Sequence, residues 1–80
     1  ESANLRKTNL EGAKLNGASF LNAYLRETNL QGADLSNASF ASANLKGANL
    51  KGAKLDGVKL EEAKLCNTTM PDGSVNDSGC

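Results

Sequence analysis

The chain has no histidine, no tryptophan and no isoleucine, and only two valines, two phenylalanines and one tyrosine among its 80 residues. A β protein normally relies on β-branched and aromatic residues. Leu, Val and Phe together number 16, one fifth of the chain, which is the boundary composition for disordered proteins. The composition alone therefore allows either a disordered chain or a very repetitive one.

The chain also lacks an excess of either charge, because nine Lys and Arg balance nine Asp and Glu. Zero net charge removes the self-repulsion that is typical of disordered chains, and it gives no support to nucleic-acid binding by bulk charge. No run of residues approaches the ~18 apolar residues that a membrane-spanning helix needs. We therefore expect no membrane insertion.

In place of these features the chain has a five-residue repeat. A large apolar residue recurs at every fifth position, and a small Ala, Thr or Val stands two residues before it. Fourteen units of the form small-x-Leu-x-x follow one another without a change of register, so the repeat decides the fold. The predicted core is Leu5, Leu10, Leu15, Phe20, Leu25, Leu30, Leu35, Phe40, Leu45, Leu50, Leu55, Leu60, Leu65 and Met70.

A period of five fits neither regular element. Leucines five apart would scatter around an α-helix, and on a straight strand they would alternate between its faces. The small residue and the leucine, two apart, share one face of an extended segment, so each unit is predicted to be a short strand followed by a corner. The corners carry residues that tolerate unusual backbone angles, namely Gly12, Gly17, Gly32, Gly47, Gly52, Gly57, Asn22, Asn37 and Asn67.

A second period, of twenty residues, gives the number of corners in a turn. Residues 1–20 and 21–40 are identical at 12 of 20 aligned positions. Twenty residues are four units, so we expect an all-β, four-sided coil with about three and a half turns, rising ~4.8 Å per turn. Phe20 and Phe40 are predicted to stack inside it, with Leu60 completing their column.

The segment A-N-L-K-G-A-N-L-K-G-A-K-L-D-G at 43–57 resembles the pentapeptide repeat family, and the resemblance extends over residues 2–70. It implies a right-handed quadrilateral β-helix over residues 1–70. The M-P-D-G-S stretch at 70–74 is similar to the end of many cyanobacterial members, which indicates a cyanobacterial or chloroplast-type protein. The chain departs from the family motif where Asp or Asn is typical, at Lys14, Tyr24, Lys54, Lys59 and Lys64.

Two columns of outward residues are interpreted as part of the scaffold. Asn9, Asn29 and Asn49 become neighbours on successive coils, where stacked asparagines can hydrogen-bond to one another. Lys14, Asp34 and Lys54 alternate in sign, which is a favourable arrangement between adjacent strands.

A third column gives the candidate partner surface. Arg6, Arg26 and Lys46 stack like charges, which is destabilising, although the nearby Glu27 can offset part of the repulsion. The column is either a solvated face or a stripe that binds an anion or an acidic partner. Leu21 and Tyr24 flank the same corner and are expected to point outward, as a small patch for protein contact or as isolated apolar residues that need no explanation.

Residues 71–80 are predicted to be a tail that caps the last coil, because the repeat stops at Met70 and Pro71 removes a backbone donor, as at protected sheet edges. The two cysteines, Cys66 and Cys80, could form a disulfide, remain free thiols or bind a metal, and two Cys without His make a poor metal site. We expect the disulfide, and with it an oxidising compartment such as the periplasm or the thylakoid lumen. Without the disulfide, a cytoplasmic location is expected.

The N-terminal coil shows no comparable cap. The sequence starts with Glu1 inside the repeat and has no initiator Met, so we expect a processed or truncated product. Either further coils upstream or a homodimer formed through the uncapped N-terminal coil is predicted to cover this end.

The sequence contains no recognisable catalytic motif. It has no His, no nucleophile beside a base, no phosphate loop and no metal-spaced cluster, so we expect no enzyme and no cofactor. The main hypothesis is a structural or interaction module that presents flat faces to an unknown protein. The alternative is a DNA-mimicking inhibitor of a type II topoisomerase, as known in the resembled family, but this requires acidic faces. An ice-binding face is disfavoured because Thr8, Thr28 and Thr68 are predicted to face inward.

Overall fold

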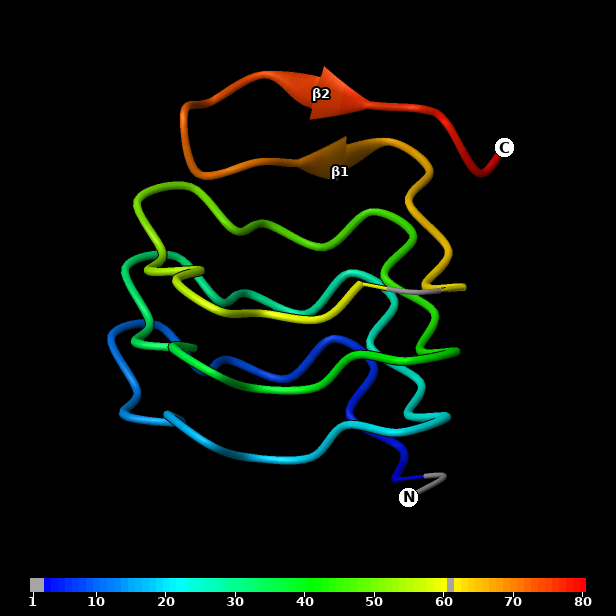
Figure 1. The fold of residues 1–80 in the computed structure, drawn as a ribbon. Coiled ribbons are helices and arrows are strands. Elements are labelled where there is room, and N and C mark those ends of the chain that lie inside the picture. The colour runs from blue at the N-terminus through cyan, green and yellow to red at the C-terminus, as the bar shows by residue number, and fades with distance from the viewer. Residues whose placement is uncertain (1–2, 61) are drawn as a thin grey trace.

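The computed structural model describes residues 3–60 and 62–80, and this part of the chain forms a four-sided coil without helices (Figure 1). Ten parallel bridges join residues that are twenty apart in the sequence. We name the four faces by their first bridged residue, Asn4, Asn9, Lys14 or Ser19. The columns are Asn4–Tyr24–Asn44–Lys64, Asn9–Asn29–Asn49–Thr69, Lys14–Asp34–Lys54 and Ser19–Ser39–Lys59. The twenty-residue period and the four-sided coil are thus confirmed.

Backbone hydrogen bonds join each unit to the coils above and below it. The N–H of Leu25 donates to the carbonyl oxygen of Asn44 at 2.8 Å, and the N–H of Tyr24 donates to that of Ala3 at 2.8 Å. The next donor along the chain, the N–H of Glu27, reaches the carbonyl oxygen of Lys46 at 2.9 Å. Because the pattern repeats in every unit, the position of each outward residue is set by its neighbours twenty residues away.

Each corner is a tight turn with one residue in the left-handed region. At the first corner the N–H of Thr8 donates to the carbonyl oxygen of Leu5 at 3.1 Å, and Lys7 between them has a φ of 58°. A positive φ at the third residue is the signature of a type II turn. Every fifth residue from 7 to 67 has a positive φ. The sequence predicts the Gly and Asn corners but not Lys7, Glu27, Ser42 and Glu62, which share this conformation.

Leucine, phenylalanine and alanine fill the inside of the coil. Leu25, Leu30, Leu35, Phe40, Leu45 and Leu50 are fully buried, and Phe20 is nearly so. The rings of Phe20 and Phe40 stack with centroids 4.9 Å apart and planes 7° apart, as the sequence predicts. The remaining predicted core residues pack against this cluster but are only partly buried, because they lie in the first and last coils: Leu5, Leu10, Leu15, Leu55, Leu60, Leu65 and Met70.

Two threonines occupy small-residue positions inside the coil. Thr28 and Thr68 are fully buried, and their hydroxyls donate to the carbonyl oxygens of Leu5 at 2.5 Å and Leu45 at 2.7 Å. Each hydroxyl is therefore satisfied by the coil before it, as a buried polar group requires. The inward threonines predicted from the sequence are confirmed at these two positions.

The asparagines of the Asn9 face act differently from the prediction. The amide oxygens of Asn9, Asn29 and Asn49 each accept the backbone N–H two residues on, at 3.0–3.1 Å, which is an Asx turn. Within the described residues their one bond to another side chain joins Asn49 to Gln31 at 3.4 Å. The predicted hydrogen bonds between stacked asparagines are wrong, because the turn N–H outside the ladder is the nearer partner.

The chain ends in a short antiparallel hairpin, which lies at the C-terminal end of the coil (Figure 1). Its strands are β1, Thr68–Thr69, and β2, Val75–Asn76. The same register continues past β2, since the N–H of Gly79 donates to the carbonyl oxygen of Leu65 at 2.7 Å. A Cβ on Gly79 would lie 2.9 Å from the Leu65 nitrogen, so this approach requires glycine.

Cys66 and Cys80 form a disulfide with their Cα atoms 4.9 Å apart. It joins the corner that follows Leu65 to the last residue of the sequence. The tail is thus held against the coil by the hairpin at one end and by a covalent bond at the other.

Reduction of this disulfide is expected to lower the free energy of unfolding by up to about 3 kcal/mol, because the bond closes a loop of about fifteen residues in the unfolded chain. Chemical denaturation with and without reductant measures the change. The Cys66→Ser/Cys80→Ser variant should match the reduced protein and show no response to reductant. Equal stability of the oxidised and reduced protein would contradict the prediction.

Two aspartates are expected to make folding acid-sensitive. The Ser36 hydroxyl and N–H hold the pKa of Asp34 below its ordinary value of 3.8, with smaller help from Lys54 and Lys14, and Ser74 does the same for Asp72. A lowered folded-state pKa stabilises the protein above pH 3.8, and this stabilisation is lost as the pH falls through the lowered value.

Melting temperatures measured from neutral pH downward should therefore fall below about pH 4. Asp34→Asn is the matched variant, because its amide oxygen still accepts the Ser36 N–H but does not titrate. Its melting temperature should fall less steeply with acid than that of the wild type. Identical acid profiles would show that Asp34 contributes nothing to the pH dependence.

Candidate functional site

The column of three cations lies along one corner of the coil, between the Asn4 and Asn9 faces. The N–H of Lys7 donates to the carbonyl oxygen of Arg26 at 2.9 Å, and the N–H of Glu27 donates to that of Lys46 at 2.9 Å. These ladder bonds bring Arg6, Arg26 and Lys46 onto successive coils, ~4.8 Å apart. All three side chains are exposed.

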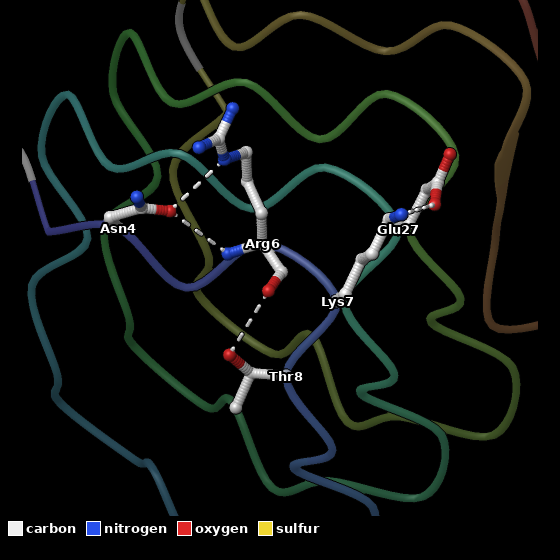
Figure 2. Close-up of polar contacts among 5 residues, drawn as sticks. All are labelled: Asn4, Arg6, Lys7, Thr8 and Glu27. Carbon is white, nitrogen blue, oxygen red and sulfur yellow. Dashed lines mark hydrogen bonds and ion pairs between the residues drawn. The ribbon is translucent and has the colours of Figure 1, made fainter.

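Asn4 orients the first of these cations. Its amide oxygen accepts the backbone N–H of Arg6 at 3.3 Å and the Nε–H of the same residue at 3.2 Å, as Figure 2 shows. The Asx turn that closes the corner thus also holds the guanidinium. Neither terminal nitrogen of Arg6 takes part in these two bonds, so the forked end of the side chain is left to meet a ligand.

The residues that directly follow Arg6 and Arg26 have opposite charges, Lys7 on the first coil and Glu27 on the second. The Lys7 Nζ lies 4.0 Å from the Glu27 Oε1, and both side chains are largely exposed (Figure 2). An exposed pair of this kind contributes at most about 1 kcal/mol to folding. The pair also fixes a direction, because the carboxylate of Glu27 points toward Lys7. The sequence predicts that Glu27 offsets repulsion in the Arg6–Arg26–Lys46 column, but among the described residues its ion pair is with Lys7, which lies outside that column.

These side chains surround a surface depression with a volume of about 650 Å³, lined by Asn4, Arg6, Lys7, Arg26 and Glu27. All five lining residues are exposed. The depression therefore opens to solvent between two arginines, with the Lys7–Glu27 pair as part of its wall.

Two of the exposed large apolar residues lie near the cations: Tyr24 on the Asn4 face itself and Leu21 at the far corner of that face, whereas the third, Val75, belongs to the hairpin. Tyr24 is bridged to Asn4 on one side and Asn44 on the other, and 52% of its surface is exposed. Leu21, at the preceding corner, is 42% exposed. We use the name basic face for the surface made by Asn4, Arg6, Lys7, Leu21, Tyr24, Arg26, Glu27, Asn44 and Lys46.

The basic face has a net positive charge, although the net charge of the whole chain is zero. Its named residues include four cations, Arg6, Lys7, Arg26 and Lys46, and one carboxylate, Glu27. On the last coil Lys64 ends the Asn4–Tyr24–Asn44 column and Glu62 lies at the adjoining corner, bonded to Ser42 at 3.3 Å, so their charges cancel. The predicted surface residues thus come together on one side of the coil. The sequence prediction missed Asn4 and Lys7, which could have been found from Asn two residues before Arg and from opposite charges twenty residues apart.

Outside the basic face, the described residues include one group of potential metal ligands. It consists of Cys66, Asp77 and Cys80, but the two sulfurs are bonded to each other, and a metal-binding cysteine has to be a thiolate. The same residues include no helix long and apolar enough to cross a membrane.

The coil has four corners per turn and one large apolar residue on the inside of each side. These features define a β-helix, which is a solenoid built from short parallel strands. A model of pentapeptide repeats matches residues 3–40 and 33–70, with eight copies of the repeat. The chain therefore belongs to the pentapeptide repeat family, and its fold is the right-handed quadrilateral β-helix.

Two solved structures show the same coil. One is HetL, a pentapeptide repeat protein involved in heterocyst differentiation regulation in the cyanobacterium Nostoc sp. strain PCC 7120, with a TM-score of 0.92 and 46% identity over 94% of this chain. The other is a pentapeptide repeat protein of the Arabidopsis thaliana thylakoid lumen, with a TM-score of 0.86 and 31% identity over 88% of this chain. This chain spans 35% of HetL and 48% of the plant protein. A search of curated proteins finds no significant match.

Removing the central cation of the column is expected to stabilise the fold. Arg26 lies between Arg6 and Lys46, so Arg26→Gln should raise the free energy of unfolding by about 0.2–1 kcal/mol at low salt, and added salt should erase the gain. Lys54→Gln is the control, because Lys54 lies beside Asp34 and its loss should not stabilise. Denaturation at two salt concentrations measures both. A destabilised Arg26→Gln protein would show that the column does not repel.

Proposed function

We propose that this protein is a non-enzymatic interaction scaffold that binds a protein partner through its basic face. The observation that carries the proposal is the stack of three cations beside two exposed apolar side chains, Leu21 and Tyr24. Like charges on adjacent strands are unfavourable for folding, whereas Arg and aromatic side chains such as Tyr are enriched where proteins bind each other. A surface that lowers stability is readily explained if a partner uses it.

The fold supports a scaffold role because it holds side chains at fixed spacing. Ladder hydrogen bonds run between all successive coils, and the interior of the central coils is fully buried. HetL is described as involved in the regulation of differentiation, which agrees with a scaffold that acts through a partner.

The C-terminal segment has two roles in this proposal. Residues 71–80 cap the last coil, supported by the β1–β2 pairing and by the bond from Gly79 to Leu65. The Cys66–Cys80 disulfide supports an oxidising compartment such as the periplasm or the thylakoid lumen, and one similar structure is that of a lumenal protein.

The alternative function from the sequence, a DNA-mimicking inhibitor of a type II topoisomerase, has no support from the charge distribution. A duplex mimic has to present rows of carboxylates, whereas the column of the first corner is cationic. The homodimer through the N-terminal coil stays a prediction, because the described contacts are all within one chain.

Site-specific photocrosslinking tests the proposal in the source cells. A photoreactive phenylalanine at Tyr24 should give a discrete crosslinked species with another protein. The same group at Lys54, on the opposite face, is the matched control and should not give that species. Equal products from both positions, or none from Tyr24, would contradict a partner surface on the basic face.

A further inference from the structure

We infer that the partner of the basic face is an acidic, extended polypeptide segment that lies along the coil axis, with its carboxylates on Arg6, Arg26 and Lys46 and an apolar side chain on Tyr24 and Leu21. This inference rests on the proposed function and adds the chemical class of the ligand. Four features of the face carry it.

The first feature is the local excess of positive charge. Four cations and one carboxylate give the basic face three more positive than negative charges, in a chain whose total is zero. The one carboxylate, that of Glu27, is paired with Lys7. The surface potential therefore favours an anionic ligand at this corner in particular.

The second feature is the orientation of the Arg6 guanidinium. Its Nε–H is held by the Asn4 amide oxygen at 3.2 Å, so the side chain has less freedom to lose when a ligand binds. The remaining N–H groups form the planar fork that matches a carboxylate in two parallel hydrogen bonds. Arg26 lines the same depression of about 650 Å³, so two guanidinium groups can address ligands there.

The third feature is spacing along the axis. Cations on three successive coils span two intervals of ~4.8 Å, or ~9.6 Å. Alternate side chains of an extended peptide are ~6.6–6.8 Å apart on one side. Two carboxylates in a Glu-x-Glu arrangement therefore fall within the length of the Arg6–Arg26–Lys46 column, where the long side chains can adjust to meet them.

The fourth feature is the apolar pair on the same face. Tyr24 and Leu21 expose 52% and 42% of their surface; Tyr24 lies on the Asn4 face, next to the cations, and Leu21 lies at the corner on the other side of that face. A hydrophobic residue of the partner can bury this surface while its acidic neighbours meet the cations. Aromatic contacts of this kind supply much of the energy of protein interfaces.

A polynucleotide fits the face less well. Binding to single strands relies on several aromatic side chains on which successive bases stack, and this chain has one tyrosine and no tryptophan. A long polyphosphate would also extend beyond the three cations, because the next residue of their column is the uncharged Cys66. A short segment with a few carboxylates avoids both problems.

The test is fluorescence anisotropy with the oxidised protein and a labelled short peptide that is rich in glutamate and has one central phenylalanine. The peptide with every glutamate replaced by glutamine is the control ligand. Arg6→Gln/Arg26→Gln should weaken binding of the acidic peptide by about tenfold, and added salt should weaken it for the wild type. Lys51→Gln/Lys59→Gln removes the same charge from other faces and should bind as the wild type does.

A third variant changes the affinity in the opposite direction. Glu27→Gln removes the one carboxylate of the basic face and frees Lys7, so it should bind the acidic peptide about two- to threefold more tightly. A variant that had only lost structure would not bind better. The gain therefore separates an electrostatic role of the face from a folding defect.

The inference is overturned if the wild type binds the glutamine peptide as well as the acidic one, or if the two double variants weaken binding equally. It is also overturned if a single-stranded oligonucleotide binds more tightly than the acidic peptide at the same salt concentration. Failure with the peptides, together with a partner crosslinked at Tyr24, would reject the acidic ligand and leave the interaction scaffold standing. Loss of both results would reject the proposed function too.

Discussion

The structure depends on one conformational constraint, the left-handed residue that recurs at every fifth position. From residue 7 to residue 62, each such residue closes a tight turn in which the N–H of the following small residue donates to the carbonyl oxygen of the inward Leu or Phe, as from Thr28 to Leu25 at 3.1 Å. A corner every five residues leaves room for one large and one small side chain per side. The scarcity of β-branched residues follows from this narrow interior, and so does the parallel ladder, which forms because equal sides stack in register.

The same constraint explains how a neutral, regular coil can carry a distinctive surface. Outward residues twenty apart are fixed as neighbours, so a charge repeated at that interval becomes a column and cannot disperse. Repetition produces a repulsive stack at Arg6, Arg26 and Lys46, whereas Asp34 separates the two lysines of the Lys14 face. The net charge of the chain therefore does not indicate which ligands its surface can bind, whereas the charge of each column of outward residues does.

Much of the fold could be predicted from the sequence, because the five- and twenty-residue periods determine which residues face inward and which become neighbours. The predictions failed where a hydrogen bond to the nearby backbone sets the orientation of a side chain or the conformation of a corner. The amide of Asn9 turns to its own backbone, since the Asx turn is closer than the next coil. The left-handed conformation of Ser42 left no signal, because the ladder imposes it on a residue that does not prefer it. Of the candidate site, the column and its apolar neighbours were predicted, whereas the contact from Asn4 to Arg6 was missed although an Asn two residues before an Arg is a sequence signal for it.

The central claim is that a rigid coil binds an acidic segment on its basic face without changing its own structure. NMR titration with the glutamate-rich peptide, combined with amide hydrogen exchange, tests this claim most directly. The account predicts chemical-shift changes confined to residues around Arg6, Tyr24, Arg26 and Lys46, while the slowly exchanging ladder amides of the central coils keep their protection. Shift changes centred on another face, or loss of protection at Leu30 and Leu35 on binding, would contradict it.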